Sequence, residues 1–217
     1  ALAVADAFID DARNAIEQRG AFYVALAGGT TPKDAYELLA QQPRRERVDW
    51  ANVHVFFSDE RCVPPTSEES NYKMAAGTLL SNVPIPPENV HRIHGEDEPE
   101  KAAAQYAAVV GKMLGNPPRF DLIMLGMGAD GHTASLFPGI DPHTDEQRLV
   151  RAYYVEKLKT HRITFTPVVI NNARHVLIAT AGLTKAPALY AVREGPYEPL
   201  VHPIQVVSPS NGRLTWY

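Results

Sequence analysis

The chain has 217 residues, of which 45% are hydrophobic, enough to bury one sizeable core, and its single cysteine, Cys62, excludes an internal disulfide framework and a four-cysteine zinc site. Its net charge of −4, with 21 lysines and arginines spread along the sequence, leaves no continuous basic stripe and argues against nucleic-acid binding. No apolar run reaches transmembrane length and no signal-peptide core is present, so we expect a cytoplasmic protein that does not enter a membrane.

The predicted elements begin with a helix at 3–19, which Gly20 ends. Because the chain opens at Ala1 without a methionine and a helix comes first, we expect a preceding strand to be missing from the sequence. In chain order, the further elements are strand 22–27, helix 34–41, strand 53–57, helices 72–80 and 99–114, strand 121–127, strands 151–155 and 162–165, strand 176–181 and a helix to about residue 193. Repeated strand-then-helix units predict one α/β domain over residues 1–217, with a mainly parallel twisted sheet and helices on both faces.

One predicted turn carries a pair of titratable side chains. The apolar run at 120–127 stops at a glycine-rich stretch that presents Asp130 and His132. Because the carboxyl-terminal edge of a doubly wound sheet binds ligands, this pair is a candidate catalytic site. Imidazole can take a proton from water and return it to a leaving oxygen, so we expect His132 to be a general base that Asp130 supports.

Two alternatives for this pair stay open. Asp130 could cap a helix, since Asp and Gly are common in turns. An Asp-x-His pair can also bind a metal, but no third ligand follows at a recognisable spacing, so no metal is expected. The chain has no Gly-x-Ser-x-Gly sequence, which weighs against a serine hydrolase.

A second turn, Gly28-Gly29-Thr30-Thr31, is suited to an anion. Glycines let the backbone approach a phosphate, and helix amides and threonine hydroxyls can donate to it. Arg61 and Lys185 also follow predicted strand ends, where each could pair with the same phosphate. Taken singly, these residues fit a structural turn and solvated or salt-bridged side chains equally well, with Asp59 or Glu60 as a partner of Arg61. The turn matches neither a Walker A sequence nor a dinucleotide fingerprint.

Several ordered blocks of the sequence resemble the glucosamine-6-phosphate isomerase/6-phosphogluconolactonase family, and within it the 6-phosphogluconolactonases. The blocks are ALAGGTTP at 25–32, FFSDERCVP at 56–64, ESNYKMA at 69–75, LGMGADGHTASLFP at 125–138, RIT at 162–164, and INNARHV with a following Gly-x-x-Lys within 170–185. Together they extend over nearly the whole chain, so the resemblance is far more specific than any single motif.

The resemblance implies hydrolysis of 6-phospho-D-glucono-1,5-lactone to 6-phospho-D-gluconate in the oxidative pentose phosphate pathway, without metal or organic cofactor. It also implies the fold of the sugar-phosphate isomerases and deaminases. The family's general base falls on His132 with Asp130 beside it. Its phosphate- and sugar-binding residues fall on Gly28, Gly29, Thr30, Thr31, Arg61, Arg162 and Lys185.

One position departs from the family pattern. Pro167 stands one place earlier than the usual leucine-proline pair, which could shift the strand that contains Arg162.

The only partner implied is the small phosphosugar lactone, with neither nucleic acid nor membrane, and the sequence makes no prediction of oligomeric state.

Two other functions compete with lactone hydrolysis. A glucosamine-6-phosphate deaminase or related isomerase shares the fold and an Asp-Gly-His turn, but carries Asn-Glu-Pro after it, where this chain has Leu136-Phe137-Pro138. A non-catalytic sugar-phosphate sensor would keep the phosphate loop and have no need of the Asp130 and His132 pair. Such regulators normally carry a basic recognition helix, which this sequence lacks.

Overall fold

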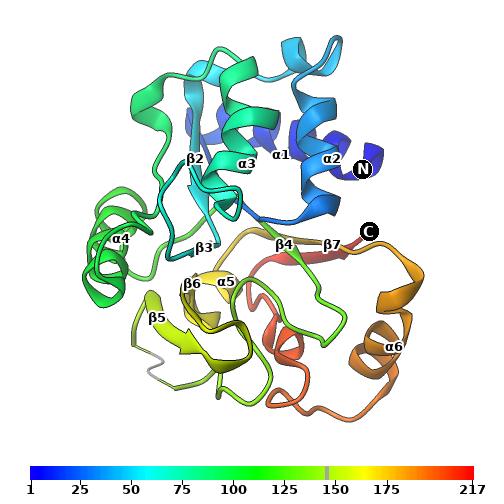
Figure 1. Cartoon of the computed structure of the whole chain (residues 1–217). Coiled ribbons are helices and arrows are strands. Elements are labelled where there is room, and N and C mark those ends of the chain that lie inside the picture. The colour runs from blue at the N-terminus through cyan, green and yellow to red at the C-terminus, as the bar shows by residue number, and fades with distance from the viewer. Residues whose placement is uncertain (145–146) are drawn as a thin grey trace.

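The computed structural model describes residues 1–144 and 147–217, and its main sheet has five parallel strands in the order β2-β1-β4-β7-β8 (Figure 1). The strands are β1 (Phe22–Leu26), β2 (Val53–Phe57), β4 (Leu122–Gly126), β7 (His175–Ala179) and β8 (Arg213–Trp216). A mainly parallel sheet with helices on both faces is therefore confirmed. All five residues of β7 and four of the five in β4 are buried, because helices cover such sheets on both sides.

Strand β8 is the one strand of this sheet that the sequence does not predict. It lies at the edge, beside β7, and its first two residues are exposed. It therefore lacks the continuous apolar run that marks the buried strands. A half-exposed edge strand of four residues carries too weak a pattern to be distinguished from a loop.

Six α-helices accompany the sheets in the described part of the chain. They are α1 (Leu2–Arg19), α2 (Thr30–Leu39), α3 (Asn71–Thr78), α4 (Pro99–Leu114), α5 (Pro167–Asn171) and α6 (Ala186–Glu194). Gly20 ends α1 in the left-handed conformation, with φ 78°, as predicted. Helix α4 has the predicted bounds, with Pro99 in its first turn and the Glu98 carboxylate accepting hydrogen bonds from two of its first amides.

A smaller antiparallel sheet adjoins the main one, in the order β3-β6-β5. Its strands are β3 (Asp59–Arg61), β5 (Val150–Val155) and β6 (Thr160–Phe165). The sequence predicts β5 and β6 but takes the residues of β3 for a turn. Ser58 joins the two sheets, because its amide donates to the Leu26 carbonyl at 2.9 Å and its carbonyl accepts from the Phe165 amide at 2.8 Å. Arg61 is therefore held on a strand instead of on a free loop.

The two sheets share one cluster of buried apolar side chains. Phe56 of β2 lies edge-on to Phe120 with ring centroids 5.2 Å apart, and Phe120 lies 5.3 Å from Phe165 of β6. Aromatic contacts of this kind add to the hydrophobic stabilisation of a core. No helix among the described residues is both long and apolar enough to cross a bilayer.

The strand order places a crevice at one edge of the main sheet. From β1 the chain passes to β2 on one side, whereas β4, β7 and β8 follow one another on the other side. The order thus reverses between β1 and β4. In open α/β sheets, ligands bind outside the carboxyl ends of the strands at such a reversal.

Candidate active site

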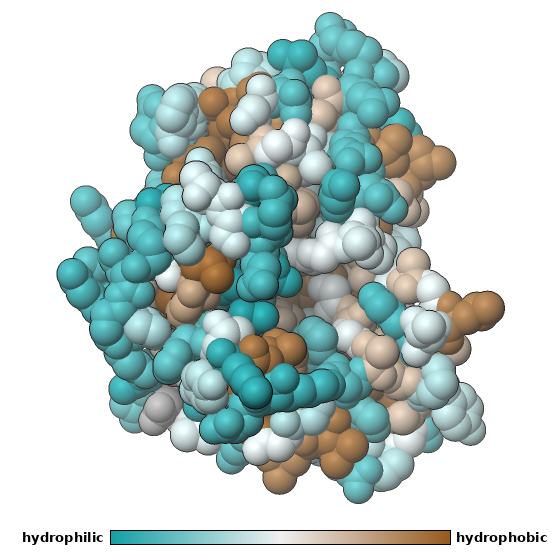
Figure 2. Space-filling view, viewed as in Figure 1, coloured by the Kyte–Doolittle hydropathy of each residue, from teal (hydrophilic) through white to brown (hydrophobic). Residues whose placement is uncertain are grey.

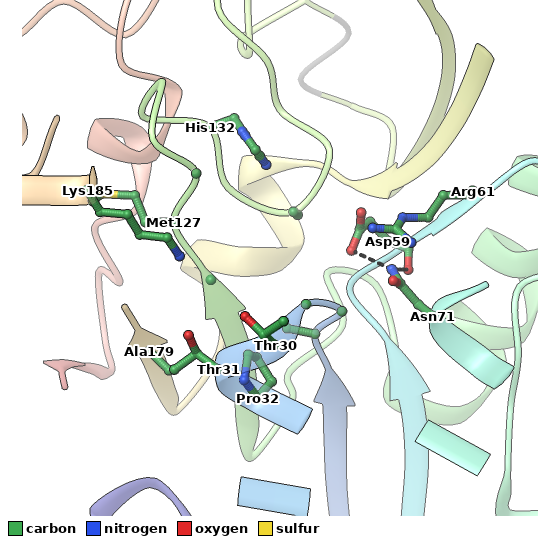
Figure 3. Close-up of a pocket in the computed structure, with 16 residues that line it drawn as sticks. Thr30, Thr31, Pro32, Asp59, Arg61, Asn71, Met127, His132, Ala179 and Lys185 are labelled. Atoms are coloured by element: carbon green, nitrogen blue, oxygen red, sulfur yellow. Dashed lines mark hydrogen bonds between the residues drawn. The ribbon is translucent and has the colours of Figure 1, made fainter. Parts of the chain in front are cut away.

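A pocket of about 230 Å³ lies at this crevice. Figure 2 shows a recess near the centre of the same face of the molecule, and Figure 3 shows the side chains around it. The lining residues come from the turns after β1 and β4, from β3, from α3 and from the segment after β7. They are Ala27, Gly28, Gly29, Thr30, Thr31, Pro32, Asp59, Arg61, Asn71, Gly126, Met127, Gly128, His132, Ala134, Ala179 and Lys185.

The turn between β1 and α2 forms one wall of the pocket. Gly29 has φ 97°, a conformation that favours glycine, and it precedes α2 without any side chain capping the helix. Thr30 and Thr31 lie in the first helical turn, because α2 begins four residues earlier than the sequence predicts. Pro32 is tolerated there, since an amide in the first turn has no intrahelical acceptor. Uncapped amides at the positive end of the helix dipole, with two hydroxyl groups, suit an anion.

Two cations line the pocket, and neither forms an ion pair within the described ranges. Lys185 ends a short 3-10 helix (Leu183–Lys185), and its ammonium group makes no hydrogen bond to any described residue (Figure 3). The Arg61 guanidinium donates to the Glu69 carbonyl, while the Glu60 carboxylate accepts from the Arg61 amide and not from its side chain. Asp59 is bound by other side chains, described below. The positive charge of both cations is therefore available to a ligand.

Arg162 lies beside Arg61 but does not line the pocket. It pairs directly with Arg61 across β3 and β6, and directly paired side chains share one face of a sheet. Arg162 is 8% exposed, does not line the pocket, and its buried Nη1 has no hydrogen-bond partner among the described residues. Burial, followed by the charge of Arg61, lowers the pKa of Arg162. Like charges held opposite each other are destabilising, so this pair favours an anion nearby.

The shift of β6 that Pro167 could have caused is not observed. Pro167 is the first residue of α5, where proline is well tolerated, and β6 keeps its pairing with β5 up to Phe165. The departure from the family pattern at Pro167 therefore leaves Arg162 in register with Arg61.

Asp130 and His132 form a hydrogen-bonded pair at the opposite wall. Nδ1 of His132 lies 2.5 Å from an Asp130 carboxylate oxygen, and the two side chains are 32% and 30% exposed. Burial alone would raise the pKa of Asp130, but the hydrogen bond and charge of His132, with a contact from Lys157 Nζ at 3.2 Å, lower that pKa to about 2. An ionised Asp130 accepts a hydrogen bond, so the neutral imidazole carries its proton on Nδ1.

This tautomer leaves Nε2 with a free lone pair, and Nε2 makes no hydrogen bond to any part of the chain that the structure describes. The ring stacks on Phe137 at a centroid distance of 4.5 Å, and Figure 3 shows it directed toward the pocket. Asp130 therefore does not cap a helix but supports an imidazole, the arrangement that a general base requires.

The turn between β4 and His132 is closely packed against the imidazole. A Cβ atom added to Gly128 would overlap the His132 ring, so only glycine fits at this position. The Gly128 amide donates to the His132 carbonyl at 2.9 Å, and the Gly131 amide donates to the Gly128 carbonyl at 3.1 Å. The turn is thus held by its own backbone as well as by Asp130.

Two polar residues of the pocket are not predicted from the sequence to be site residues. Asp59 is predicted only as a possible partner of Arg61, and Asn71 belongs to the ESNYKMA block without an assigned role. Figure 3 shows the Asn71 amide hydrogen-bonded to Asp59 beside Arg61. The signal that could have drawn attention to them is their place in two of the blocks that resemble the family.

The pocket offers no evident metal site. Within residues 1–144 and 147–217, no three His, Cys, Asp or Glu side chains come close enough together to hold a metal ion. The half-buried Cys62 lies outside the pocket, and burial raises the pKa of its thiol to about 11, which keeps it protonated and poorly nucleophilic.

Comparisons with known proteins agree with this geometry. The family profile described as glucosamine-6-phosphate isomerases/6-phosphogluconolactonase matches residues 1–216. A 6-phosphogluconolactonase of Haemophilus influenzae is 37% identical over 195 residues, covering 90% of this chain and 83% of that protein. One from a Nostoc species is 39% identical over 207 residues, covering 93% and 83%. The crystal structure of 6-phosphogluconolactonase from Thermotoga maritima superposes with a TM-score of 0.85 at 32% identity, covering 98% of this chain and 92% of that one.

Proposed function

Because this chain belongs to the glucosamine-6-phosphate isomerase/6-phosphogluconolactonase family, we propose that it is an enzyme that hydrolyses 6-phospho-D-glucono-1,5-lactone to 6-phospho-D-gluconate. One observation carries the proposal: the imidazole of His132 and the cations Arg61 and Lys185 line the same pocket. This substrate has an electrophilic carbonyl at one end and a phosphate at the other. It therefore needs a base and a cationic anchor within the span of one hexose.

The base acts through Nε2 of His132. Nε2 takes a proton from a water molecule as its oxygen attacks the lactone carbonyl, and a tetrahedral oxyanion forms. Asp130 stabilises the resulting imidazolium through Nδ1. When the intermediate collapses, the bond between the carbonyl carbon and the ring oxygen breaks, and the imidazolium protonates that oxygen. This transfer returns His132 to its neutral form. The carboxylic acid then loses its own proton to solvent water, so the products are a carboxylate and a hydroxyl group.

The anchor is the turn Gly28 to Thr31 with Arg61 and Lys185, and Arg162 adds positive charge beside Arg61. Binding the phosphate there holds the lactone carbonyl near Nε2. Such positioning contributes several kcal/mol to lowering a barrier when the reacting atoms are well aligned.

An apolar residue follows the catalytic turn, which favours this reaction over aldose-ketose isomerisation or deamination. Phe137 stacks on the imidazole and Leu136 is 3% exposed, so no carboxylate stands where the isomerases and deaminases carry a glutamate after the turn.

We take residues 1–217 as one catalytic domain, because a single apolar cluster includes both sheets. A lone cysteine favours the reducing cytoplasm as its compartment.

The reaction is tested by following acid release from freshly prepared 6-phosphogluconolactone with a pH indicator. Purified protein should accelerate hydrolysis well above the spontaneous rate and release no ammonia from glucosamine 6-phosphate, the control substrate. Hydrolysis at the spontaneous rate would refute the proposal, and ammonia release would indicate a deaminase.

The anchor is tested separately with Arg61→Ala and Lys185→Ala. Each variant loses one charge-assisted contact to phosphate, so we expect KM to rise roughly tenfold with a smaller change in kcat. Lys33→Ala is the matched control, because Lys33 lies on α2 outside the pocket and pairs only weakly with Glu37 at 3.6 Å. Unchanged KM in both pocket variants would place the phosphate elsewhere.

A further inference from the structure

A chain of three buried polar side chains connects the two walls of the pocket. Asn71, Asp59 and Ser135 are 2%, 6% and 1% exposed. They come from α3, from β3 and from the segment after β4, so no local sequence pattern brings them together. Polar groups buried this deeply are costly unless they are hydrogen-bonded, and here each one bonds to the next.

The chain begins at the anion-binding turn. A Cβ atom on Gly28 would overlap the carboxamide of Asn71, so this carboxamide lies directly against the Gly28 backbone. Its Nδ2 donates to the Asp59 carbonyl at 2.9 Å and to one Asp59 carboxylate oxygen at 3.2 Å. Asn71 therefore supports the turn from behind while fixing one side of the Asp59 carboxylate.

The chain ends at the turn that carries the base. The second carboxylate oxygen of Asp59 accepts a hydrogen bond from Ser135 Oγ at 2.6 Å. Ser135 follows His132 by three residues, and its amide donates to Thr164 Oγ1 of β6 at 3.2 Å. Ala134, just before it, has φ 46°, so the backbone takes an uncommon conformation to bring Ser135 to Asp59.

The middle of the chain is itself held in place. Both oxygens of the Glu60 carboxylate are occupied, by the amides of Arg61, Asn71 and Tyr72 and by Ser70 Oγ, at 2.7 to 3.0 Å. These contacts fasten the start of α3 to β3. Asn71 and Asp59 are therefore fixed relative to each other by several hydrogen bonds besides their own.

We propose that Asn71, Asp59 and Ser135 are positioning residues that set the separation between the bound phosphate and His132. The proposal rests on the proposed function, because only a substrate held at both ends makes that separation matter. Rates depend steeply on the placement of reacting groups, and an error of 1 Å can reduce a rate by about 100-fold. The two carboxylate oxygens of Asp59 accept hydrogen bonds from opposite walls of the pocket. A single substitution can therefore remove the contact to one wall and leave the contact to the other in place.

Ser135→Ala releases the wall with the base. It removes one hydroxyl group and otherwise keeps the shape of the side chain, so folding should be little affected. We expect kcat to fall roughly tenfold while the affinity for 6-phosphogluconate changes less than about threefold. Asn71→Ala releases the anion-binding wall, and we expect mainly a weaker affinity, again roughly tenfold.

The double variant tests whether the two walls are connected. If the chain acts as one bridge, the second substitution interrupts a bridge that is already broken. The loss in kcat/KM should then be smaller than the product of the single losses, by roughly fivefold or more. Asn89→Ala is the matched control for Asn71, because Asn89 is also buried and donates to one backbone carbonyl but lies outside the pocket. Combined with Ser135→Ala, it should give losses that multiply.

Multiplying losses for the Asn71 and Ser135 pair, within about twofold, would overturn the bridge while leaving the enzymatic function intact. The same holds if Ser135→Ala leaves kcat unchanged, and this single variant decides the matter if Asn71→Ala does not fold. A wild-type protein without lactonase activity would overturn both proposals.

Discussion

Replacing Asp130 with asparagine changes one atom of the catalytic pair and leaves its shape intact. The carboxylate oxygen lies 2.5 Å from His132 Nδ1 and carries the negative charge that faces the imidazolium. An asparagine carboxamide is neutral, and its nitrogen can donate to Nδ1 and so move the ring proton to Nε2. The variant therefore loses both the charge and the preferred tautomer. We expect kcat to fall with little change in KM.

The size of the fall follows from the exposure of the pair. A hydrogen bond to a charged partner contributes about 1.5–3 kcal/mol. Both side chains are close to one-third exposed, and Lys157 partly neutralises Asp130, so the lower half of that range applies. A loss of about 1.5–2 kcal/mol of transition-state stabilisation lowers kcat roughly 10- to 30-fold.

The assay is acid release from the lactone at saturating substrate, corrected for spontaneous hydrolysis. Lys157→Ala is the control, since Lys157 touches the same carboxylate but is 74% exposed, and a contact that exposed should change kcat less than about threefold. If Asp130→Asn keeps the wild-type kcat, Asp130 does not support the base, and the assignment of the Nδ1 tautomer is wrong.

Two further predictions concern packing and pH. Gly128→Ala would place a Cβ atom against the His132 ring and should lower kcat roughly 100-fold. Gly77→Ala in α3 is the control, because the new atom has open space around it, and this variant should raise the free energy of unfolding by about 0.5–1 kcal/mol. Equal kcat in both variants would contradict the close packing of Gly128 against His132. Burial, and then His54, lowers the pKa of His91 to about 4. In the unfolded chain this imidazole becomes protonated near pH 6.5, whereas in the folded chain it stays neutral until about pH 4. The free energy of unfolding should therefore fall as the pH is lowered from 6.5 to 4, by about 1–2 kcal/mol for this partly exposed ring. Urea titrations at both pH values should show a smaller fall in His91→Phe, and an unchanged fall would exclude His91 as its source.

The sequence predicts best where local pattern and buried position coincide. The strands β2 and β4 are apolar runs that are followed by charged residues or end in glycine, and α4 starts at a proline. Their places therefore follow from the local sequence pattern alone. His132 and Asp130 are two residues apart, and a pair that close in the chain must also be close in space. Their candidate role could therefore be predicted before any tertiary structure was known.

The prediction fails where a contact joins distant segments. Strand β3 is three charged residues long, and it is a strand only because β6 pairs with it from a hundred residues away. Ser135 and Asp59 are 76 positions apart, and neither residue type in isolation suggests a buried hydrogen bond. The position of Arg162 beside Arg61, outside the pocket lining, likewise depends on the pairing of β3 with β6.

The central claim is that one imidazole performs the chemistry while separate cations hold the substrate. The most direct test is His132→Ala, with kcat measured on the lactone and the affinity for 6-phosphogluconate measured by calorimetry. We predict a loss of roughly 100-fold or more in kcat, since a positioned general base contributes that much, with affinity within about threefold of wild type. Turnover near the wild-type rate in this variant would contradict the account.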